Sequence, residues 1–411
     1  MKSVVVVGAS LSGVRASDSI LKHNSDVEVT LIGDEVHHPY NRPPLSKEAL
    51  ASGSDLDSIK LRLANKDGRL KLILGRSVVS HDGESHKITT DDGIALSYDA
   101  LVVASGISPR RLNIPRVDRG IFQLRTYDDM VALIERIKVG EASTKRVVVL
   151  GAGFIGCEIA ATLTTLGHQV TVVAPEDAPM QRPLGVVLGG EIRRRHEANG
   201  VTFLMGQLPI SIEEAGSDSH FGERRLGGVT VNLSSGSAIE CDLVIEAVGS
   251  SPNTSFLDSS NFDTNDGLLV DETLHAGLGV FAVGDVARYP NLLIDGVPRR
   301  IEHWGLAVDS GRYVGRSIKA FFDGGKAEPF TTLPAFWSDQ FDIRLQSFGL
   351  PGLVVEPEAI SLLEGELSGD CVFGYHRDND LVGVVIVGMA SEHRRLKDLV
   401  EEALSKGRTT S

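Results

Sequence analysis

One sequence pattern occurs twice in this chain of 411 residues and constrains the fold more than any other feature. A short β-branched apolar run leads into a glycine turn and then into a helical pattern. The two turns are Gly8-Ala9-Ser10-Leu11-Ser12-Gly13 and Gly151-Ala152-Gly153-Phe154-Ile155-Gly156. Glycine tightens such a turn and lets phosphates approach the backbone, while the helix N-terminus supplies free N–H groups. One copy is weak evidence, but two copies, each followed by a second strand, predict two bound dinucleotides with electron transfer between them.

The order of the other elements predicts that the first dinucleotide unit is split in the sequence. This unit needs more strands than its own segment provides, and the chain after residue 243 can supply them. The second unit is then inserted into the first, which brings the two nucleotide sites face to face. We expect an α/β fold with two Rossmann-like dinucleotide-binding domains, arranged as in glutathione reductase, and a C-terminal α+β domain.

Changes in composition set the expected domain boundaries. The first domain is expected at residues 1–115 and 244–323, the inserted domain at 116–243 and the C-terminal domain at 324–411. Within the last domain, strands at 371–376 and 381–387 flank Asp378-Asn379-Asp380, which predicts a hairpin. An amphipathic helix is expected near 392–405.

The composition excludes several classes of protein. A formal net charge of −14 disfavours a nucleic-acid partner. No apolar run approaches the roughly 20 residues of a membrane span, and the first strand begins directly after Met1-Lys2-Ser3, so we expect a cytoplasmic protein. We also expect no metal site, and a monomer or a weak dimer.

Three cysteines, Cys157, Cys241 and Cys371, lie far apart in the sequence. Their spacing excludes a disulfide framework and the active disulfide of glutathione- or thioredoxin-reductase-type flavoenzymes. Cys157 lies just inside the second glycine-turn helix, where a thiolate would be favoured, but a small buried side chain is the preferred interpretation.

Two carboxylates are candidate cofactor ligands on sequence position alone. Asp34 lies 21 residues beyond Gly13 at the end of the second strand, where a carboxylate can accept both hydroxyls of an adenosine ribose. Asp285 follows a strand and Gly284, which suits a polar anchor, although a helix N-cap would also explain it.

Five segments resemble those of one family, the FAD-dependent ferredoxin reductases of bacterial cytochrome P450 and aromatic-ring dioxygenase systems. The resemblance covers nearly the whole chain. The segments are Pro39-Tyr40-Asn41-Arg42-Pro43-Pro44-Leu45-Ser46-Lys47, Leu124-Arg125-Thr126, Gly284-Asp285-Val286-Ala287, Glu302-His303-Trp304 and Phe336-Trp337-Ser338-Asp339-Gln340.

The resemblance implies that the first unit binds FAD and the second binds NADH or NADPH. It implies catalytic roles at the flavin for Lys47, paired with Glu158, and for Trp337. It also implies a larger set of cofactor-binding residues: Gly8, Ser10, Gly13, Asp34, Glu35, Arg42, Lys47, Val79, Arg125, Gly151, Gly153, Ile155, Gly156, Glu176, Gly249, Gly284, Asp285, Glu302, His303 and Trp304. Taken alone, several of these residues have ordinary alternatives: a surface lysine, a carboxylate compensating a helix dipole, or tryptophans filling a core.

Two positions depart from the family pattern. Asn41 stands where the family often has an acidic residue, and Ala174 stands where a glutamate usually binds the NADH ribose. Glu176 and Asp177 follow closely, and the nearest arginine is Arg182, so we expect NADH to be preferred over NADPH.

The expected activity is transfer of electrons from NADH through FAD to a [2Fe–2S] ferredoxin that supplies a P450 or a Rieske-type oxygenase. Two alternatives remain open: an NADH oxidase, and a non-catalytic NADH-binding flavoprotein of the apoptosis-inducing-factor type. We expect the ferredoxin to dock near Trp337 on a basic surface formed by Arg110-Arg111 and Arg299-Arg300.

Overall fold

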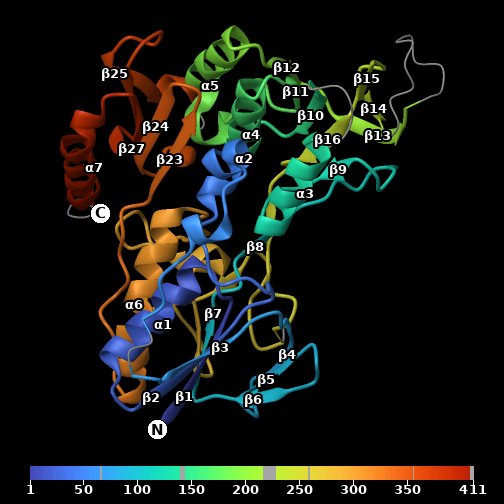
Figure 1. Ribbon diagram of the computed structural model, residues 1–411. Helices are drawn as coiled ribbons and strands as arrows, with labels where there is room; N and C mark the ends of the chain where they lie inside the picture. Colours follow the sequence, from blue (N-terminus) through green and yellow to red (C-terminus); the bar gives the residue numbers. More distant parts are fainter. Residues whose placement is uncertain (65–66, 139–143, 216–227, 258–259, 355, 408–411) are drawn as a thin grey trace.

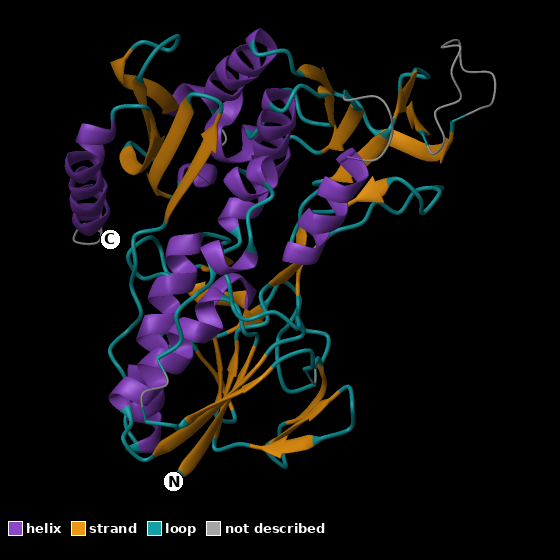
Figure 2. Ribbon diagram, in the orientation of Figure 1, coloured by secondary structure: helices purple, strands orange, loops and turns teal. Residues whose placement is uncertain are grey.

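The computed structural model describes residues 1–64, 67–138, 144–215, 228–257, 260–354 and 356–407. Figure 1 shows three units, with the N-terminus in the lower one, the second glycine turn in the upper right one and the chain's end in the upper left one. Figure 2 shows that the first two units combine helices and strands, whereas strands dominate the third. Among the described residues, no helix is both long and apolar enough to cross a membrane.

The first unit is built on a six-stranded sheet with the order β19-β20-β7-β1-β2-β3. Its strands are β1 (Lys2–Val7), β2 (Val27–Ile32), β3 (Leu70–Ile73), β7 (Ala100–Val103), β19 (His275–Gly277) and β20 (Val280–Ala282). The valines and leucines of β1 and β7 are almost wholly buried, as expected for central parallel strands. Because β19 and β20 come from the chain after residue 243, the expectation of a split unit is confirmed.

Two helices lie together against this sheet, as Figure 1 shows: α1 (Leu11–His23) and α6 (Trp304–Phe322). Glycines in α6 make the close approach possible. A Cβ at Gly315 would lie 2.4 Å from the backbone of Ser19, and one at Gly311 would lie 2.7 Å from the Ser12 carbonyl oxygen. This packing fixes the start of α1, which borders the site described below.

The second unit has its own five-stranded sheet, with the order β12-β11-β10-β16-β9. Its strands are β9 (Ile121–Phe122), β10 (Arg146–Leu150), β11 (Gln169–Ala174), β12 (Thr202–Met205) and β16 (Leu243–Glu246), and its helices are α3 (Tyr127–Lys138), α4 (Phe154–Thr165) and α5 (Gln181–Ala198). β16 pairs with β10, so the expected boundary at 243/244 is wrong: it would cut a strand of this sheet. The chain returns to the first unit only after β16.

The chain crosses between these two units at a single place. The outgoing strand β8 (Ile107–Pro109) and the returning strand β17 (Ser250–Pro252) pair antiparallel, with Ile107 opposite Pro252. Ser105 and Asn253 add two hydrogen bonds beside this pair, of 2.6 and 2.9 Å. The inserted unit is therefore held on a two-stranded stalk.

The C-terminal unit is an antiparallel sheet with the order β23-β24-β27-β26-β25, and α7 (His393–Gly407) packs on it. The strands are β23 (Ala335–Gln340), β24 (Ile343–Gly349), β25 (Ile360–Gly365), β26 (Cys371–Arg377) and β27 (Asp380–Val387). The expected hairpin is present, and Asp378 and Asn379 adopt left-handed φ angles of 52° and 70° at its turn. The core of this unit is shared with α5, whose Leu184 and Leu188 pack among its buried residues.

Smaller elements complete the described fold. They are α2 (Glu48–Ser52), the sheet of β4 (Val78–Asp82), β5 (Lys87–Thr90) and β6 (Ala95–Ser97), the sheet of β13 (Pro209–Glu214), β14 (Val229–Leu233) and β15 (Ala238–Cys241), and the sheet of β18 (Leu268–Leu269), β21 (Ala287–Pro290) and β22 (Pro298–Arg300).

Candidate functional site

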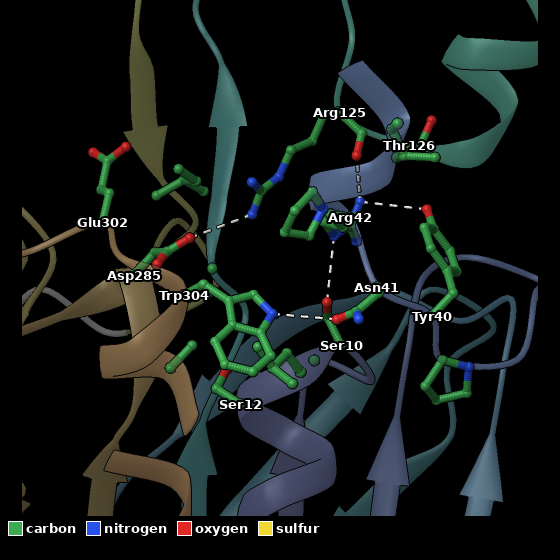
Figure 3. A pocket seen from close by; sticks show the side chains of 18 of the residues that line it. Ser10, Ser12, Tyr40, Asn41, Arg42, Arg125, Thr126, Asp285, Glu302 and Trp304 are labelled. Carbon is green, nitrogen blue, oxygen red and sulfur yellow. Dashed lines mark hydrogen bonds and ion pairs between the residues drawn. The ribbon is translucent and has the colours of Figure 1, made fainter. Parts of the chain in front are cut away.

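A cavity of about 340 Å³ lies where the three units meet. Its lining comes from the first glycine turn, the 39–47 loop, the segments around Arg125 and Asp285, the start of α4, and β23. Figure 3 shows part of this lining, with Arg42 and Arg125 on one side and Trp304 on the other. All five segments that carry the family resemblance contribute residues to it.

The first glycine turn presents an open helix start to the cavity. Gly8 has a φ of +113°, and a Cβ there would lie 2.1 Å from the Ala104 carbonyl oxygen. A Cβ at Gly13 would lie 1.9 Å from the Gly8 oxygen, so both glycines are needed for close packing of helix and strand. Ser10 is the N-cap of α1 but makes no side-chain cap. The N–H groups of the first turn thus remain available to a phosphate.

Arg42 fixes the side of the cavity next to this turn. Its guanidinium lies 2.5 Å from the Glu35 carboxylate, donates to the Arg125 carbonyl oxygen at 2.7 Å and contacts the Ser10 hydroxyl at 3.3 Å. Tyr40 donates a 2.5 Å hydrogen bond to the other Glu35 oxygen, and burial raises the pKa of Tyr40, so it remains a donor. Asp34 also lines the cavity and is exposed.

A second guanidinium faces a carboxylate deeper in the cavity. Arg125 and Asp285 are 3.5 Å apart and are one quarter and one fifth exposed. Burial lowers the pKa of Arg125 and raises the pKa of Asp285, with the nearby Arg125 charge opposing the second shift. Asp285 lies inside a short 3₁₀ helix whose N-cap is Val283, so an N-cap role does not explain it.

Lys47 and Glu158 form the expected salt bridge, with a distance of 2.6 Å. Lys47 follows the Pro-rich loop of the first unit, whereas Glu158 lies on α4 of the second unit. Their side chains are only 17% and 7% exposed, so water screens the pair weakly. Both residues line the cavity, which places a buried ion pair with a fixed ammonium group in its wall.

Aromatic side chains close the mouth of the cavity. The rings of Trp304 and Trp337 meet edge to face at 5.5 Å, and each residue is 37% exposed. They are therefore surface-facing cavity residues and do not fill a core. The Trp304 indole N–H donates to Asn41 at 3.2 Å, which gives this departure from the family pattern a structural role (Figure 3).

His303 lies directly before Trp304 and also faces the cavity. Burial lowers its pKa to about 4, so the imidazole is neutral at ordinary pH. Its Nδ1 atom is buried and has no hydrogen-bond partner in the part of the chain that the structure describes. An orphaned polar atom of this kind suits a ligand that can hydrogen-bond to it.

The second glycine turn repeats the geometry of the first. A Cβ at Gly151 would lie 2.3 Å from the Ala247 oxygen, and one at Gly156 would lie 2.1 Å from the Gly151 oxygen. Gly153 differs, because no atom lies within 4 Å of the position its Cβ would take. It is the uncapped N-cap of α4, and the next residues, Phe154 and Ile155, line the cavity. This open cradle fits the phosphates of a second dinucleotide.

The turn after β11 carries the residues expected to select the nicotinamide cofactor. Ala174 is wholly buried, so a glutamate at this position would have to bury its carboxylate. Glu176 and Asp177 lie in the following turn, half-buried and exposed respectively. Neither residue lines the cavity.

The structure places two predicted cofactor residues outside the cavity lining and distinguishes between the two interpretations of Cys157. Val79 is 53% exposed on β4 and lies outside the cavity lining. Gly249 lies directly before the returning strand of the stalk and is likewise outside the lining. Cys157 is fully buried and burial raises its pKa, which rules against a thiolate and supports the packing interpretation.

The expected basic surface is also partly wrong. Arg299 pairs with Asp295, and Arg300 pairs with Asp266 and Glu302. Their charges are therefore offset locally. Arg111 is exposed, with no ion pair within 4.0 Å among the described residues, and remains a candidate.

Reasoning from the sequence did not single out the residues that hold Glu158. The Ser46 and Ser338 hydroxyls each donate to its carboxylate at 2.6 Å. One signal was available: along β23, Phe336, Ser338 and Gln340 are buried while Trp337 and Asp339 are exposed. A buried serine and glutamine at alternate positions must find partners, which points to a polar network.

Taken together, the cavity fits an adenine dinucleotide at the first turn. An uncapped helix start and the guanidinium groups of Arg42 and Arg125 suit a pyrophosphate, and the carboxylates of Asp34 and Asp285 suit hydroxyl groups. Within the described residues, no group of three or more His, Cys, Asp or Glu is placed to hold a metal ion. His37, one of two adjacent histidines, pairs instead with Asp128 at 2.7 Å.

Comparison with known proteins agrees with this geometry. Residues 2–311 match the family model for pyridine nucleotide-disulphide oxidoreductases, and residues 335–409 match the model for the reductase C-terminal domain. Rhodocoxin reductase of Rhodococcus erythropolis is 32% identical and is aligned over 97% of this chain and 89% of its own length. The anthranilate 1,2-dioxygenase system ferredoxin–NAD(+) reductase component of Burkholderia cepacia is 33% identical over 85% and 82% of the two chains. The crystal structure of a ferredoxin reductase from Rhodopseudomonas palustris superposes with a TM-score of 0.86, at 31% identity, over 96% of this chain and 93% of the other.

Proposed function

Because the chain belongs to the pyridine nucleotide-disulphide oxidoreductase family, we propose that it is a flavoprotein reductase that passes electrons from NADH through FAD to a [2Fe–2S] ferredoxin. The ferredoxin in turn supplies a cytochrome P450 or a Rieske-type oxygenase. The relatives named ferredoxin reductases support this proposal, and so does the cavity with its two open helix starts.

The Lys47–Glu158 pair is the observation that carries the proposal. A bound FAD would supply the redox chemistry, namely acceptance of a hydride from NADH and release of single electrons. Lys47 places an ammonium group in the cavity wall beside Glu158, where its remaining N–H donors favour a ligand atom that gains negative charge. Glu158 holds that charge in place. The Arg42 and Arg125 side chains bind the phosphate part, and Trp304 and Trp337 shield the mouth from water.

The proposal includes a preference for NADH over NADPH. Glu176 and Asp177 make the turn after β11 negative, and residues 174–181 contain no arginine to pair with a 2′-phosphate. A 2′-phosphate would therefore meet repulsion at this turn without a compensating contact.

The proposed ferredoxin surface is the mouth of the cavity, formed by Trp304 and Trp337, together with Arg110 and Arg111. Both arginines are exposed and follow closely in the sequence after Ile107 and Ser108, which line the cavity. Ferredoxins that serve such reductases are typically acidic, whereas this chain carries a net charge of −14. Encounter therefore needs a local excess of positive charge.

Reversing both charges, in Arg110→Glu with Arg111→Glu, should raise the KM for ferredoxin about tenfold and flatten its dependence on salt. Turnover of NADH with ferricyanide should be unchanged, which controls for damage to the cavity. Equal salt dependence of ferredoxin kinetics in the variant and the wild type would remove these arginines from the proposed surface.

The proposed function is tested by a flavin spectrum of the purified protein, stopped-flow reduction with NADH and NADPH, and turnover with a panel of [2Fe–2S] ferredoxins. We expect bound FAD, faster reduction by NADH, and rapid reoxidation by at least one ferredoxin. Oxygen consumption that matches NADH consumption would favour an oxidase. A long-lived reduced complex that ferredoxin does not reoxidise would favour the non-catalytic alternative.

A further inference from the structure

The Glu158 carboxylate receives donors from all three units of the molecule. Lys47 and Ser46, from the first unit, approach Oε2 at 2.6 Å each. Ser338, from β23 of the C-terminal unit, donates to Oε1 at 2.6 Å. Glu158 itself lies on α4 of the second unit and is 6% exposed. A buried carboxylate is stable only when it is paired and hydrogen-bonded in this way, so its position depends on each donor.

The donor from the C-terminal unit does not act alone. Ser338 has one hydroxyl proton, which it gives to Glu158, so its oxygen accepts from its neighbour, the Gln340 amide, at 2.9 Å. The Gln340 oxygen then faces the Nε2 atom of His196 at 2.8 Å. An amide oxygen only accepts, so His196 carries its proton on Nε2. Every hydrogen bond in this series therefore points toward Glu158.

The far end of the series is rigid and dry. His196, in the last turn of α5, is 0% exposed, and its ring is held edge-on by Phe203 and Phe341 at 5.8 and 5.0 Å. Burial lowers the pKa of His196, so the imidazole is neutral. Ser338 and Gln340 are 0% and 1% exposed. We call His196, Gln340 and Ser338 the Ser338 chain.

Resting on the reductase function proposed above, we propose that the Ser338 chain positions Glu158, and through it the Lys47 ammonium group, in the wall of the cavity. Aligned dipoles in a low-dielectric interior stabilise the carboxylate charge and hold its orientation. Glutamine does not titrate, so the chain sets position and field and transfers no proton. It also makes the geometry of the cavity depend on how the C-terminal unit is docked.

The test uses the FAD-loaded protein with Ser338→Ala, which removes the last donor, and Gln340→Met, which breaks both inner links at similar volume. Reduction at saturating NADH should slow about tenfold in Ser338→Ala, the loss typical of one hydrogen bond to a charged group. The KM for NADH should change less than about twofold, because the effect acts on a charge that matters during transfer. The midpoint potential of bound FAD should fall in both variants.

A matched control is available on the neighbouring strand. Ser347 is also 0% exposed, and its hydroxyl has no hydrogen-bond partner in the described part of the chain. Ser347→Ala should leave the rate of reduction and the midpoint potential unchanged. A second comparison places Ser338→Ala in a Glu158→Gln background, where it should have little further effect if the chain acts through Glu158.

Two results would overturn the proposal. In the first, Ser338→Ala and Gln340→Met have the same reduction rate and midpoint potential as Ser347→Ala. In the second, Ser338→Ala slows reduction as much in the Glu158→Gln background as in the wild type. If NADH does not reduce the wild type at all, the proposed function fails instead. The potentials can still be measured by chemical titration, so the two failures are distinguishable.

Discussion

At the scale of single residues, some side-chain contacts could be predicted from the sequence and others could not. The Lys47–Glu158 pair was expected from the resemblance, and the structure places its atoms 2.6 Å apart. The partners of Arg299 and Arg300 were not predictable, because Asp295, Asp266 and Glu302 reach them through local folding of short strands and loops. In a sequence, every charged residue is counted equally. In the folded chain, an opposite charge within 3 Å cancels most of the long-range field of a charged side chain.

At the same scale, Lys47→Met should slow reduction by NADH by about ten- to hundredfold while FAD stays bound, because the side chain supplies charge and does not hold the phosphates. Stopped-flow absorbance and the flavin content of the purified variant measure the two effects. Lys60→Met is the matched control: Lys60 is 42% exposed, pairs only with Asp57 among the described residues, and lies outside the cavity lining. Wild-type rates in Lys47→Met would show that the ammonium group is not needed.

At the scale of elements, periodicity and turn chemistry predicted most of what the structure contains. The amphipathic helix expected near 392–405 is α7, and the Asp378-Asn379 turn closes the expected hairpin. The boundary at 243/244 failed because β16 resembles β7, and only pairing shows to which sheet a buried parallel strand belongs. Val79, which the resemblance implied as a cofactor residue, lies on β4 outside the cavity lining.

An element-scale prediction concerns the turn after β11. Replacing Glu176 with Gln and Asp177 with Arg should raise kcat/KM for NADPH about tenfold, because repulsion is removed and a guanidinium can pair with the 2′-phosphate. Steady-state kinetics with both cofactors check this, with Glu358→Arg, a charge change on an exposed 3₁₀ helix of the C-terminal unit, as the control. An unchanged ratio of NADPH to NADH efficiency would mean that the 2′ position lies elsewhere.

At the scale of the whole molecule, buried histidines set how stability responds to pH. Burial lowers the pKa of His303 to about 4 and also lowers the pKa of His196, His168 and His275. The unfolded chain protonates these histidines near pH 6.5, whereas the folded chain does so only at lower pH. Their contribution to the free energy of unfolding is therefore complete above pH 6.5 and is lost as the pH falls. Asp285, whose pKa is raised, acts in the opposite direction: its contribution is present at low pH and is lost as pH rises through its folded pKa.

The free energy of unfolding should therefore decrease between pH 6.5 and 4, and His303→Gln should reduce this decrease by about 1 to 2 kcal/mol. Urea unfolding at pH 7 and pH 5, followed by far-UV circular dichroism, gives both values. His37→Gln, which alters a surface pair with Asp128, is the comparison variant. If the free energy of unfolding changes equally with pH in His303→Gln and in the wild type, His303 is protonated to the same extent in the folded and the unfolded chain.

The two-stranded stalk has a consequence for how such a gene can be edited. Because Pro109 and Ser250 are paired neighbours, the segment between them leaves and rejoins its host at one point. Excising it would require only a short bridging turn, and the host sheet would lose none of its strands. The C-terminal unit would lose more, since Leu184 and Leu188 of the excised segment form one wall of its core. The host would lose cover too, because Tyr40, Leu45 and Leu50 pack in the core of the excised segment. A shortened gene would therefore yield a host and a third unit that each expose an apolar face.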